Sequence, residues 1–294
     1  MNLLLVVLGT AVLVVVTIDQ FATIAGTGAG SGLVVHRLND GLWRLALRVH
    51  RMWPSHRRLA VIGTGLLVLT PLVWILGLWV GWTAIFAAST DAVVDGQGRE
   101  PATLLGRIYF AGFSLFTLGL GDLHPGTDGW RMLTVLAALM GLAMVTLSIT
   151  YLVPVVQAAT AKASLSRTLG QFDLADDSGP RTSQPQSVVQ QLTDMVADIN
   201  EMSDAHLTHQ ALRYYHALED ADSLAVQVCK LHVFLSSQRD LVDEGHALGR
   251  ERQRRAAFAL ACSITRESRQ DEASVYRSLL AHDGRSDHPV RALL

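Results

Sequence analysis

The stretch Thr117-Leu118-Gly119-Leu120-Gly121-Asp122 is the most informative part of this chain. Two glycines alternate with other residues, and glycine adopts backbone conformations that residues with a side chain resist. Successive carbonyl groups can therefore point in one direction, toward a common axis. A ring of such carbonyls replaces the water shell of a dehydrated cation. The stretch thus predicts a cation selectivity filter made of main-chain oxygens.

The filter stretch lies between two long apolar segments. Residues 59–89 carry no charged side chain, and residues 132–162 reach their first charge at Lys162. A helix needs roughly 20 apolar residues to cross a bilayer, so both segments predict transmembrane helices. Non-helical backbone at that depth is tolerated only where protein buries it or a cavity wets it. We therefore expect the stretch to lie in a re-entrant loop.

The composition agrees with a membrane protein. The chain has 294 residues, of which 50% are hydrophobic, with a formal net charge of −2. That charge gives no general attraction to nucleic acid. Cys229 and Cys262 lack metal-type spacing and are interpreted as reduced packing residues. We find no nucleophile–base pattern or paired acids, and we expect neither an enzyme nor a cofactor other than conducted ions.

The N-terminal segment is also apolar. Residues 3–18 are uncharged and end at Asp19, without a basic first region or a convincing cleavage site. The two interpretations are a signal peptide and a retained transmembrane helix over residues 1–25, and we favour the helix. Residues 26–32 alternate glycine with other small residues; they lack the lysine of a phosphate loop and predict a flexible linker.

Arginine predicts the orientation in the membrane. The region between the first two spans carries six arginines against the single acid Asp40: Arg37, Arg44, Arg48, Arg51, Arg57 and Arg58. Such an excess marks a cytoplasmic loop. We therefore expect a multi-pass protein of the cell membrane, with the N-terminus outside, the filter near the outer side and the C-terminal part in the cytoplasm.

Residues 33–58 contain an amphipathic pattern. Leu42, Leu45, Ala46, Val49 and Trp53 share one helix face, and arginines occupy the other. This pattern is typical of a helix in the cytoplasmic membrane interface. The alternative is a helix docked on the soluble part of the same protein. Tryptophans near the ends of the spans, Trp43 and Trp82 among them, predict interfacial belts.

Residues 102–116 are too short to span and predict a half-helix that ends at the filter, with Pro101 in its first turn. Its C-terminal end would direct partial negative charge toward a cation. After the inner helix, residues 173–187 are rich in Asp, Ser, Gly, Pro and Gln and predict a linker. Residues 188–294 predict an all-helical cytoplasmic domain, with helices over about 205–219, 222–243, 247–267 and 271–281.

With these features in place, residues 59–160 resemble the pore module of the potassium channel superfamily in its bacterial two-helix form. The resemblance rests on outer helix, half-helix, residues 117–122, Pro125 and inner helix, in that order. It implies an all-α membrane protein in which four identical subunits surround one pore. It also implies monovalent cation sites at the carbonyls of Thr117, Leu118, Gly119 and Leu120, with the Thr117 hydroxyl.

The filter departs from the usual family sequence in two places. Leu118 replaces a β-branched residue, and Leu120 replaces an aromatic residue whose hydroxyl bonds to the half-helix, a bond leucine cannot donate. Phe113 stands where the family places a carboxylate. Asp122 is therefore expected to bond to its own loop or to Tyr109, or to attract cations.

Two residues of the inner helix are gating candidates. Gly141 suits a hinge by resemblance, and the alternative is close helix packing. Pro154 can kink the helix near its inner end, and the alternative is a kink without function. The outer acids Asp91, Asp95 and Glu100 suit an electrostatic funnel or ordinary loop solubility. The Gly77–Gly81 pair predicts a helix-packing face. His206 and His209 could share a metal, but surface histidines are the favoured interpretation.

The resulting hypothesis is a potassium-preferring cation channel that assembles as a homotetramer in membrane lipid and conducts K⁺ passively. One alternative is a non-selective or sodium-conducting pore, argued from Leu120. Another is a non-conducting, membrane-anchored signalling or scaffold protein, argued from the large soluble part.

Overall fold

Long apolar helices dominate the first half of the chain. The computed structural model describes residues 1–294 except 26–31, 54, 97–99, 173, 177–178, 181–190, 220–221, 238–243 and 266–270. In the described part, three helices are long and apolar enough to cross a membrane: α1 (Leu3–Ala25), α3 (His56–Ala87) and α5 (Asp128–Gly170). Each of the three predicted spans thus corresponds to a helix of sufficient length. The predicted glycine linker lies almost entirely outside the described residues.

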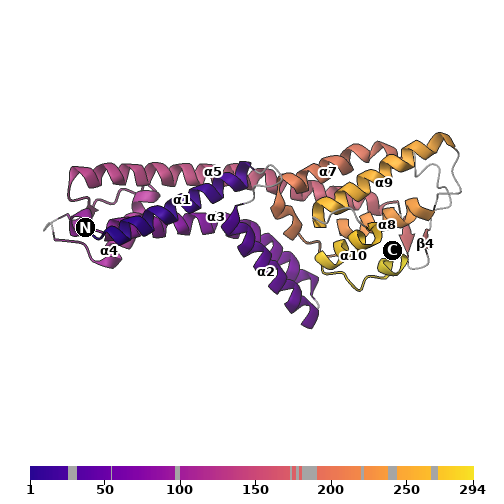
Figure 1. Cartoon of the computed structure of the whole chain (residues 1–294), viewed down its shortest axis with the longest axis horizontal. Helices are drawn as coiled ribbons and strands as arrows, with labels where there is room; N and C mark the ends of the chain where they lie inside the picture. The colour runs from indigo at the N-terminus through magenta and orange to yellow at the C-terminus, as the bar shows by residue number, and fades with distance from the viewer. Residues whose placement is uncertain are drawn as a thin grey trace. The chain divides into compact units, whose positions relative to one another are not determined.

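The contacts divide the chain into two compact units. The first comprises Met1–Leu38 and Leu67–Val153, and the second comprises Asn39–Leu66 and Pro154–Leu294. Three helices, α2 (Leu33–Met52), α3 and α5, therefore contribute to both units. In the first unit α1, α3 and α5 run alongside one another, with α4 (Leu104–Leu115) at one end (Figure 1).

Close packing of small residues joins α1 to α3. A Cβ atom on Gly77 would lie 2.5 Å from Val16, and one on Gly81 would lie 2.6 Å from Leu13. On the facing helix, a Cβ atom on Gly9 would lie 2.7 Å from the Gly81 carbonyl oxygen. Only small residues permit such an approach. The predicted packing role of Gly77 and Gly81 is confirmed.

Two buried polar side chains of α1 bond to the other helices of the unit. The Asp19 carboxylate accepts hydrogen bonds from Trp74 Nε1 at 2.9 Å and from the Val34 amide at 2.7 Å. Gln20 Nε2 donates to the Met144 carbonyl of α5 at 3.2 Å. A buried carboxylate requires such partners. The apolar helix is therefore held in the unit by specific bonds as well as by packing.

Two connections hold α4 in place, one from α3 and one to α5. The first contains η1 (Thr90–Ala92) and strand β1 (Val94–Asp95), and the second contains strand β2 (Leu123–His124). The two strands pair antiparallel, with Val94 opposite His124. The expected place of Pro101 is wrong. Thr103 caps α4 by accepting from the Gly106 amide, and Pro101 precedes the cap in a bridge to Val94.

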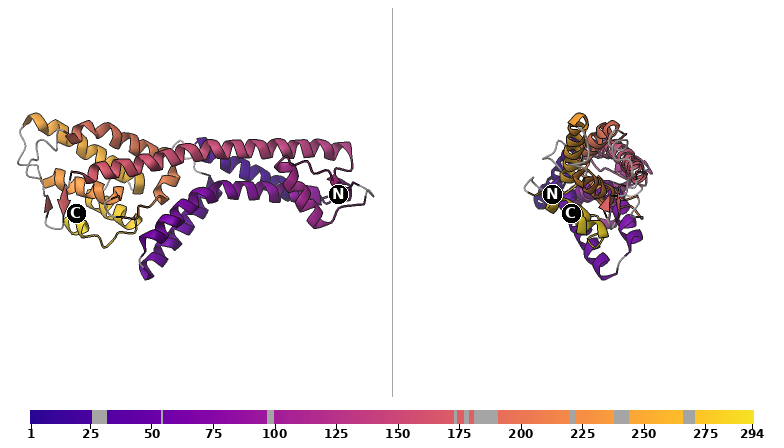
Figure 2. Two further views of the ribbon diagram at one scale, coloured as in Figure 1. Left: turned by 180° about the vertical axis from the view of Figure 1, so that it is seen from behind. Right: turned by 90° about the vertical axis from the view of Figure 1, so that its right-hand side faces the viewer.

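The second unit is mostly helical, and the two views of Figure 2 show its helices gathered around one another. Its core is formed by the end of α5 with five further elements: α7 (Val196–Thr208), α8 (Leu224–Ser237), α9 (Glu244–Thr265), α10 (Glu272–His282) and η3 (Pro289–Leu293). The helices expected over 222–243, 247–267 and 271–281 have counterparts in α8, α9 and α10. The helix expected over 205–219 is wrong, because α7 ends at Thr208 and only the short η2 (Gln210–Tyr214) follows within that range.

The predicted linker contains one pair of short strands. Two-residue strands β3 (Ala175–Asp176) and β4 (Gly179–Pro180) pair antiparallel within it. In the described residues of 188–294 the elements are helical, as expected. The rest of the linker lies mostly outside the described residues.

The amphipathic segment forms α2 (Leu33–Met52), and residues 56–58 already belong to α3. Trp43 of α2 is 3% exposed, and its ring contacts Tyr214, His216 and His282. This face of α2 therefore packs on helices of the second unit, as in the alternative interpretation. Leu45 and Trp53 remain exposed, so an interfacial position for that side of the helix stays a prediction.

Trp43 and Trp82 do not form interfacial belts. Both side chains are almost completely buried within the chain, and Trp82 stacks on Phe86 with ring centroids 5.5 Å apart. Composition near the end of a span does not distinguish a belt residue from a packed one, because both demand a large apolar ring.

Candidate functional site

The filter stretch follows α4 as an extended loop with an alternating backbone. Positive φ angles occur at Thr117 (55°), Gly119 (59°) and Gly121 (80°), and not at the residues between them. Left-handed backbone suits glycine but strains a residue with a Cβ atom, as at Thr117. The glycine spacing of the sequence thus coincides with the alternation of the backbone.

The carbonyl oxygens of the filter differ from those around them in their main-chain bonding within the described part of the chain. Among the described residues, no backbone amide donates to the carbonyls of Thr117, Leu118, Gly119 or Leu120. By contrast, the Asp122 carbonyl accepts from the Gly96 amide at 2.9 Å. Unpaired carbonyls are costly away from water, so they need water or a cation. These four are the oxygens that the sequence assigns to cation binding.

Both ends of the filter are anchored. At the start, the Thr117 amide donates to Ser114 at 3.2 Å and the Leu118 amide donates to Phe113 at 2.9 Å. At the end, Asp122 Oδ1 accepts from the Leu123 amide at 3.0 Å, and the Tyr109 hydroxyl interacts with the same carboxylate. Asp122 thus bonds to its own loop, one of the partners that the sequence suggested, and interacts electrostatically with Tyr109. Tyr109 lies on α4, so it links the end of the filter to the half-helix.

The two unusual filter side chains do not pack within their own chain. Leu118 is 64% exposed and Leu120 is 55% exposed, and no atom lies within 4 Å of a Cβ atom placed on Gly119 or Gly121. A single chain therefore contributes one open strand of carbonyls and does not enclose a cation.

The half-helix α4 is fixed against α3. Trp79 Nε1 donates to the Ile108 carbonyl at 2.8 Å, and Arg107 donates to the Ala87 carbonyl at 3.1 Å. Phe113 is buried and lies edge-on to Phe110, with centroids 5.1 Å apart. The family carboxylate position is therefore filled by aromatic packing. The C-terminal end of α4, with its partial negative charge, leads directly into the filter.

Gly141 lies in contact with the end of the half-helix. A Cβ atom there would be 2.1 Å from the Leu115 carbonyl oxygen and 2.9 Å from its Cα. Main chain on both sides leaves no flexible side chain to move. This contact supports the close-packing interpretation, and α5 continues unbroken through the position.

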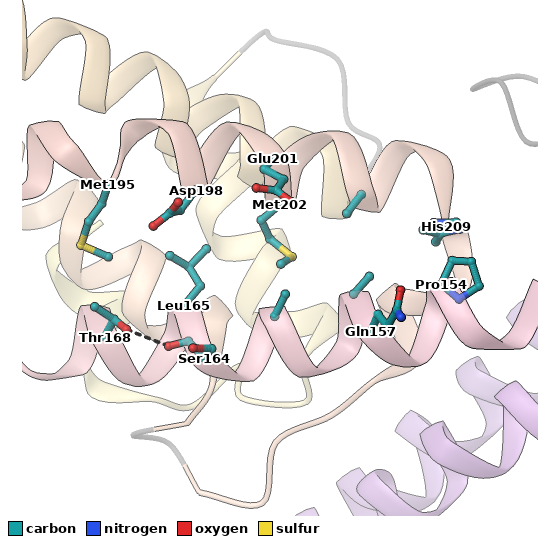
Figure 3. A pocket seen from close by; sticks show the side chains of 13 residues that line it. Pro154, Gln157, Ser164, Leu165, Thr168, Met195, Asp198, Glu201, Met202 and His209 are labelled. Carbon is teal, nitrogen blue, oxygen red and sulfur yellow. Dashed lines mark hydrogen bonds between the residues drawn. The ribbon is translucent and has the colours of Figure 1, made fainter.

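Pro154 lies within α5, which continues to Gly170. It stands at one end of a groove of about 530 Å³ between α5 and α7 (Figure 3). Gln157 and His209 lie near it, and Met195 and Thr168 line the opposite end (Figure 3). The groove lies in the second unit, so the gating candidate adjoins α7 of that unit.

The outer acids remain at the surface. Asp91, Asp95, Glu100 and Asp122 are all exposed. Such exposure is compatible with a funnel for cations and with loop solubility.

The expectation of a surface histidine is wrong for His206. His206 is 2% exposed, and burial lowers its pKa to about 3. His216 is also buried and lies beside His56, with 3.1 Å between ring nitrogens. In the described part of the chain, no group of three or more His, Cys, Asp or Glu side chains has the geometry to hold a metal. Sequence reasoning missed the His56–His216 pair because 160 residues separate the two.

Comparison with known proteins gives one family match within the predicted pore module. Residues 72–158 match a family model described as ion channel. The match contains the filter stretch, Gly141 and Pro154. The matched family consists of channels and is not enzymatic.

A bacterial membrane protein also matches, over about half of its length. It is the uncharacterized membrane protein YdjJ of Bacillus subtilis (strain 168), 32% identical over 165 residues. The alignment covers 56% of this chain and 48% of that protein, so the chain spans about half the length of the curated relative it matches. No solved structure matches the chain significantly.

Proposed function

Because residues 72–158 carry an ion channel pore domain, we propose that the chain forms a homotetrameric, potassium-preferring cation channel of the cell membrane. The observation that carries this proposal is the filter strand, with alternating positive φ angles and four carbonyls that lack main-chain donors. Since each chain supplies one open strand, four copies are needed to surround an ion. The N-terminus would be outside and the second unit in the cytoplasm.

Conduction would be passive. A dehydrated K⁺ ion moves between successive rings of carbonyls from Thr117, Leu118, Gly119 and Leu120, and entry of a second ion displaces the first. The C-terminal end of α4 and the exposed Asp122 add negative potential along this path. The Thr117 hydroxyl would complete the innermost site.

Gating would use the inner end of α5. Beyond Pro154, Lys162 is buried, and its Nζ donates to the carbonyls of Leu212 at 3.1 Å and Tyr215 at 3.0 Å. These bonds join α5 to the segment after α7. A rearrangement of the cytoplasmic helices would therefore pull on α5 close to the proline, whereas Gly141 would serve packing more than hinging.

A second candidate is a non-selective or sodium-conducting pore. Leu120 has no hydroxyl to bond behind the filter, and its side chain is 55% exposed in the single chain. A filter held less rigidly discriminates less between ion sizes. The Tyr109–Asp122 interaction argues for potassium preference, because it provides another attachment between filter and half-helix.

Ion flux into liposomes tests the function. Purified protein is reconstituted, and uptake of K⁺ and Na⁺ is compared under equal gradients. We expect K⁺ uptake well above that of empty liposomes and above Na⁺ uptake. Equal uptake would favour the non-selective pore, and uptake no greater than in empty liposomes would favour a non-conducting protein.

A further inference from the structure

Helix α2 presents three large apolar side chains on its outward side. Leu45, Met52 and Trp53 are 54%, 64% and 65% exposed. The opposite side of the helix is fixed, because Trp43 and Ala46 are buried and the Trp43 ring packs on Tyr214 of the second unit. The helix therefore cannot turn its outward side inward without losing that packing. Clustered apolar exposure of this kind marks a surface for a membrane or a partner.

The same region carries positive charge without nearby negative charge. Four of its arginines are exposed: Arg44 and Arg48 of α2, and Arg57 and Arg58 of α3. In the part of the chain that the structure describes, none of the four lies within ion-pair distance of a carboxylate. The acid closest in sequence, Asp40, accepts a hydrogen bond from the Tyr214 hydroxyl. Arg51 is not counted, because it lines a cavity together with Asp287.

The arginines of the two helices belong to one surface, because the end of α2 and the start of α3 lie together. The rings of His50 and His56 have centroids 5.0 Å apart, and His50 Nδ1 accepts from the Ser55 amide at 3.1 Å. Trp53 lies in the short turn between the two helices. The exposed apolar side chains and the four arginines are thus gathered at one corner of the second unit, which we call the α2–α3 surface.

The length of α3 agrees with a position of this surface at the edge of a membrane. From Leu59 to Ala87 the helix is uncharged, a run of about 43 Å at the rise of an α-helix. A bilayer with its headgroup layers is roughly 40–45 Å thick. Arg57 and Arg58 are the last charged residues before that run. When α3 spans a bilayer, they therefore fall in or beside the headgroup layer.

We propose that the α2–α3 surface binds anionic phospholipid. Arginine pairs with phosphate through two hydrogen bonds at once, and exposed apolar side chains beside it enter the boundary between headgroups and acyl chains. A nucleic acid or an acidic protein would match the charge, but only lipid is brought within reach of Arg57 and Arg58 by α3 itself. Through Trp43, on its other side, α2 would then join the lipid surface to the second unit. The binding requires that α3 spans a membrane and does not depend on conduction.

The test is tryptophan quenching of the full-length protein in phosphatidylcholine vesicles that contain a minor fraction of brominated phosphatidylglycerol or brominated phosphatidylcholine. The difference between each protein and its Trp53→Phe variant isolates Trp53. We expect both brominated lipids to quench Trp53, the anionic one more strongly. One arginine near an anionic surface adds about fivefold to binding, so Arg48→Gln should lower the preference for anionic lipid by about three- to fivefold. The matched control Arg252→Gln removes an exposed arginine of α9, also without a carboxylate partner among the described residues, and should leave the preference unchanged.

Salt gives a second measurement that needs no arginine variant. At 1 M salt the Debye length is about 3 Å, so the preference for anionic lipid should nearly disappear while quenching of Trp53 by either lipid remains. The proposal is overturned if neither lipid quenches Trp53, if the two lipids quench it equally at low salt, or if Arg252→Gln lowers the preference as much as Arg48→Gln. Absence of ion flux in the same vesicles would contradict the proposed channel and leave the lipid result unchanged.

Discussion

Replacement of Gly141 by alanine should disturb both the stability of the first unit and the filter. The new Cβ atom would lie 2.1 Å from the Leu115 carbonyl oxygen, whereas ordinary contacts begin at 3.4 Å. The helix or the end of α4 must therefore move by about an ångström. Overpacking costs up to about 3 kcal/mol, and the better helix propensity of alanine returns about 1 kcal/mol. The net loss is about 2 kcal/mol per subunit, or roughly a 30-fold change in the folding equilibrium.

The matched control is Gly65→Ala. Gly65 also lies inside a long apolar helix, but no atom lies within 4 Å of its Cβ position. Alanine should therefore stabilise the helix there by about 1 kcal/mol. Unfolding of the purified variants in detergent, followed by intrinsic fluorescence, measures both effects. Leu115 lies two residues before Thr117, so we also expect the Gly141 variant to conduct less in liposomes. Equal stability and flux for Gly141→Ala and the native protein would refute this reasoning.

Three further changes have defined outcomes. Gly119→Ala adds a Cβ atom that meets no neighbouring atom but sits on backbone with a φ angle of 59°, which costs about 1–2 kcal/mol. The protein should therefore still fold, but ion flux should be lost. Retained flux would show that Gly119 is not part of the conducting strand. Trp74→Phe removes the indole N–H that donates to the buried Asp19 carboxylate. The first unit should be destabilised by about 1.5–3 kcal/mol, which denaturant unfolding measures. Unchanged stability would show that Asp19 finds another partner. Burial lowers the pKa of His206 to about 3 and of His282 to about 4. Below pH 6.5 the unfolded chain therefore binds more protons at these histidines than the folded chain does. The second unit should lose about 2 kcal/mol of stability per histidine when the pH falls to 5. His206→Gln should reduce that slope, and an unchanged slope would contradict the assignment.

The spans, the half-helix and the filter were predictable because their signals are local. Uncharged length predicts a span, and alternating glycines predict the backbone that the structure shows at 117–121. The start of α4 was predicted less well. Proline and threonine are both common at helix starts, so the sequence offers both Pro101 and Thr103. The bridge between Val94 and Pro101 lies outside the helix and leaves Thr103 as the cap of α4.

The docking of α2 could not be predicted in the same way. Trp43 has the same apolar character whether it meets lipid or Tyr214, and only the fold of the second unit selects between them. Asp19 was treated as the end of an apolar run, because its partner Trp74 is 55 residues away.

Single-channel recording of the purified protein between K⁺ on one side and Na⁺ on the other tests the central claim most directly. The account predicts unitary currents that reverse at a potential showing preference for K⁺, carried through the carbonyls of residues 117–120. Currents that reverse near zero would contradict potassium preference, and the absence of unitary currents would contradict the channel itself.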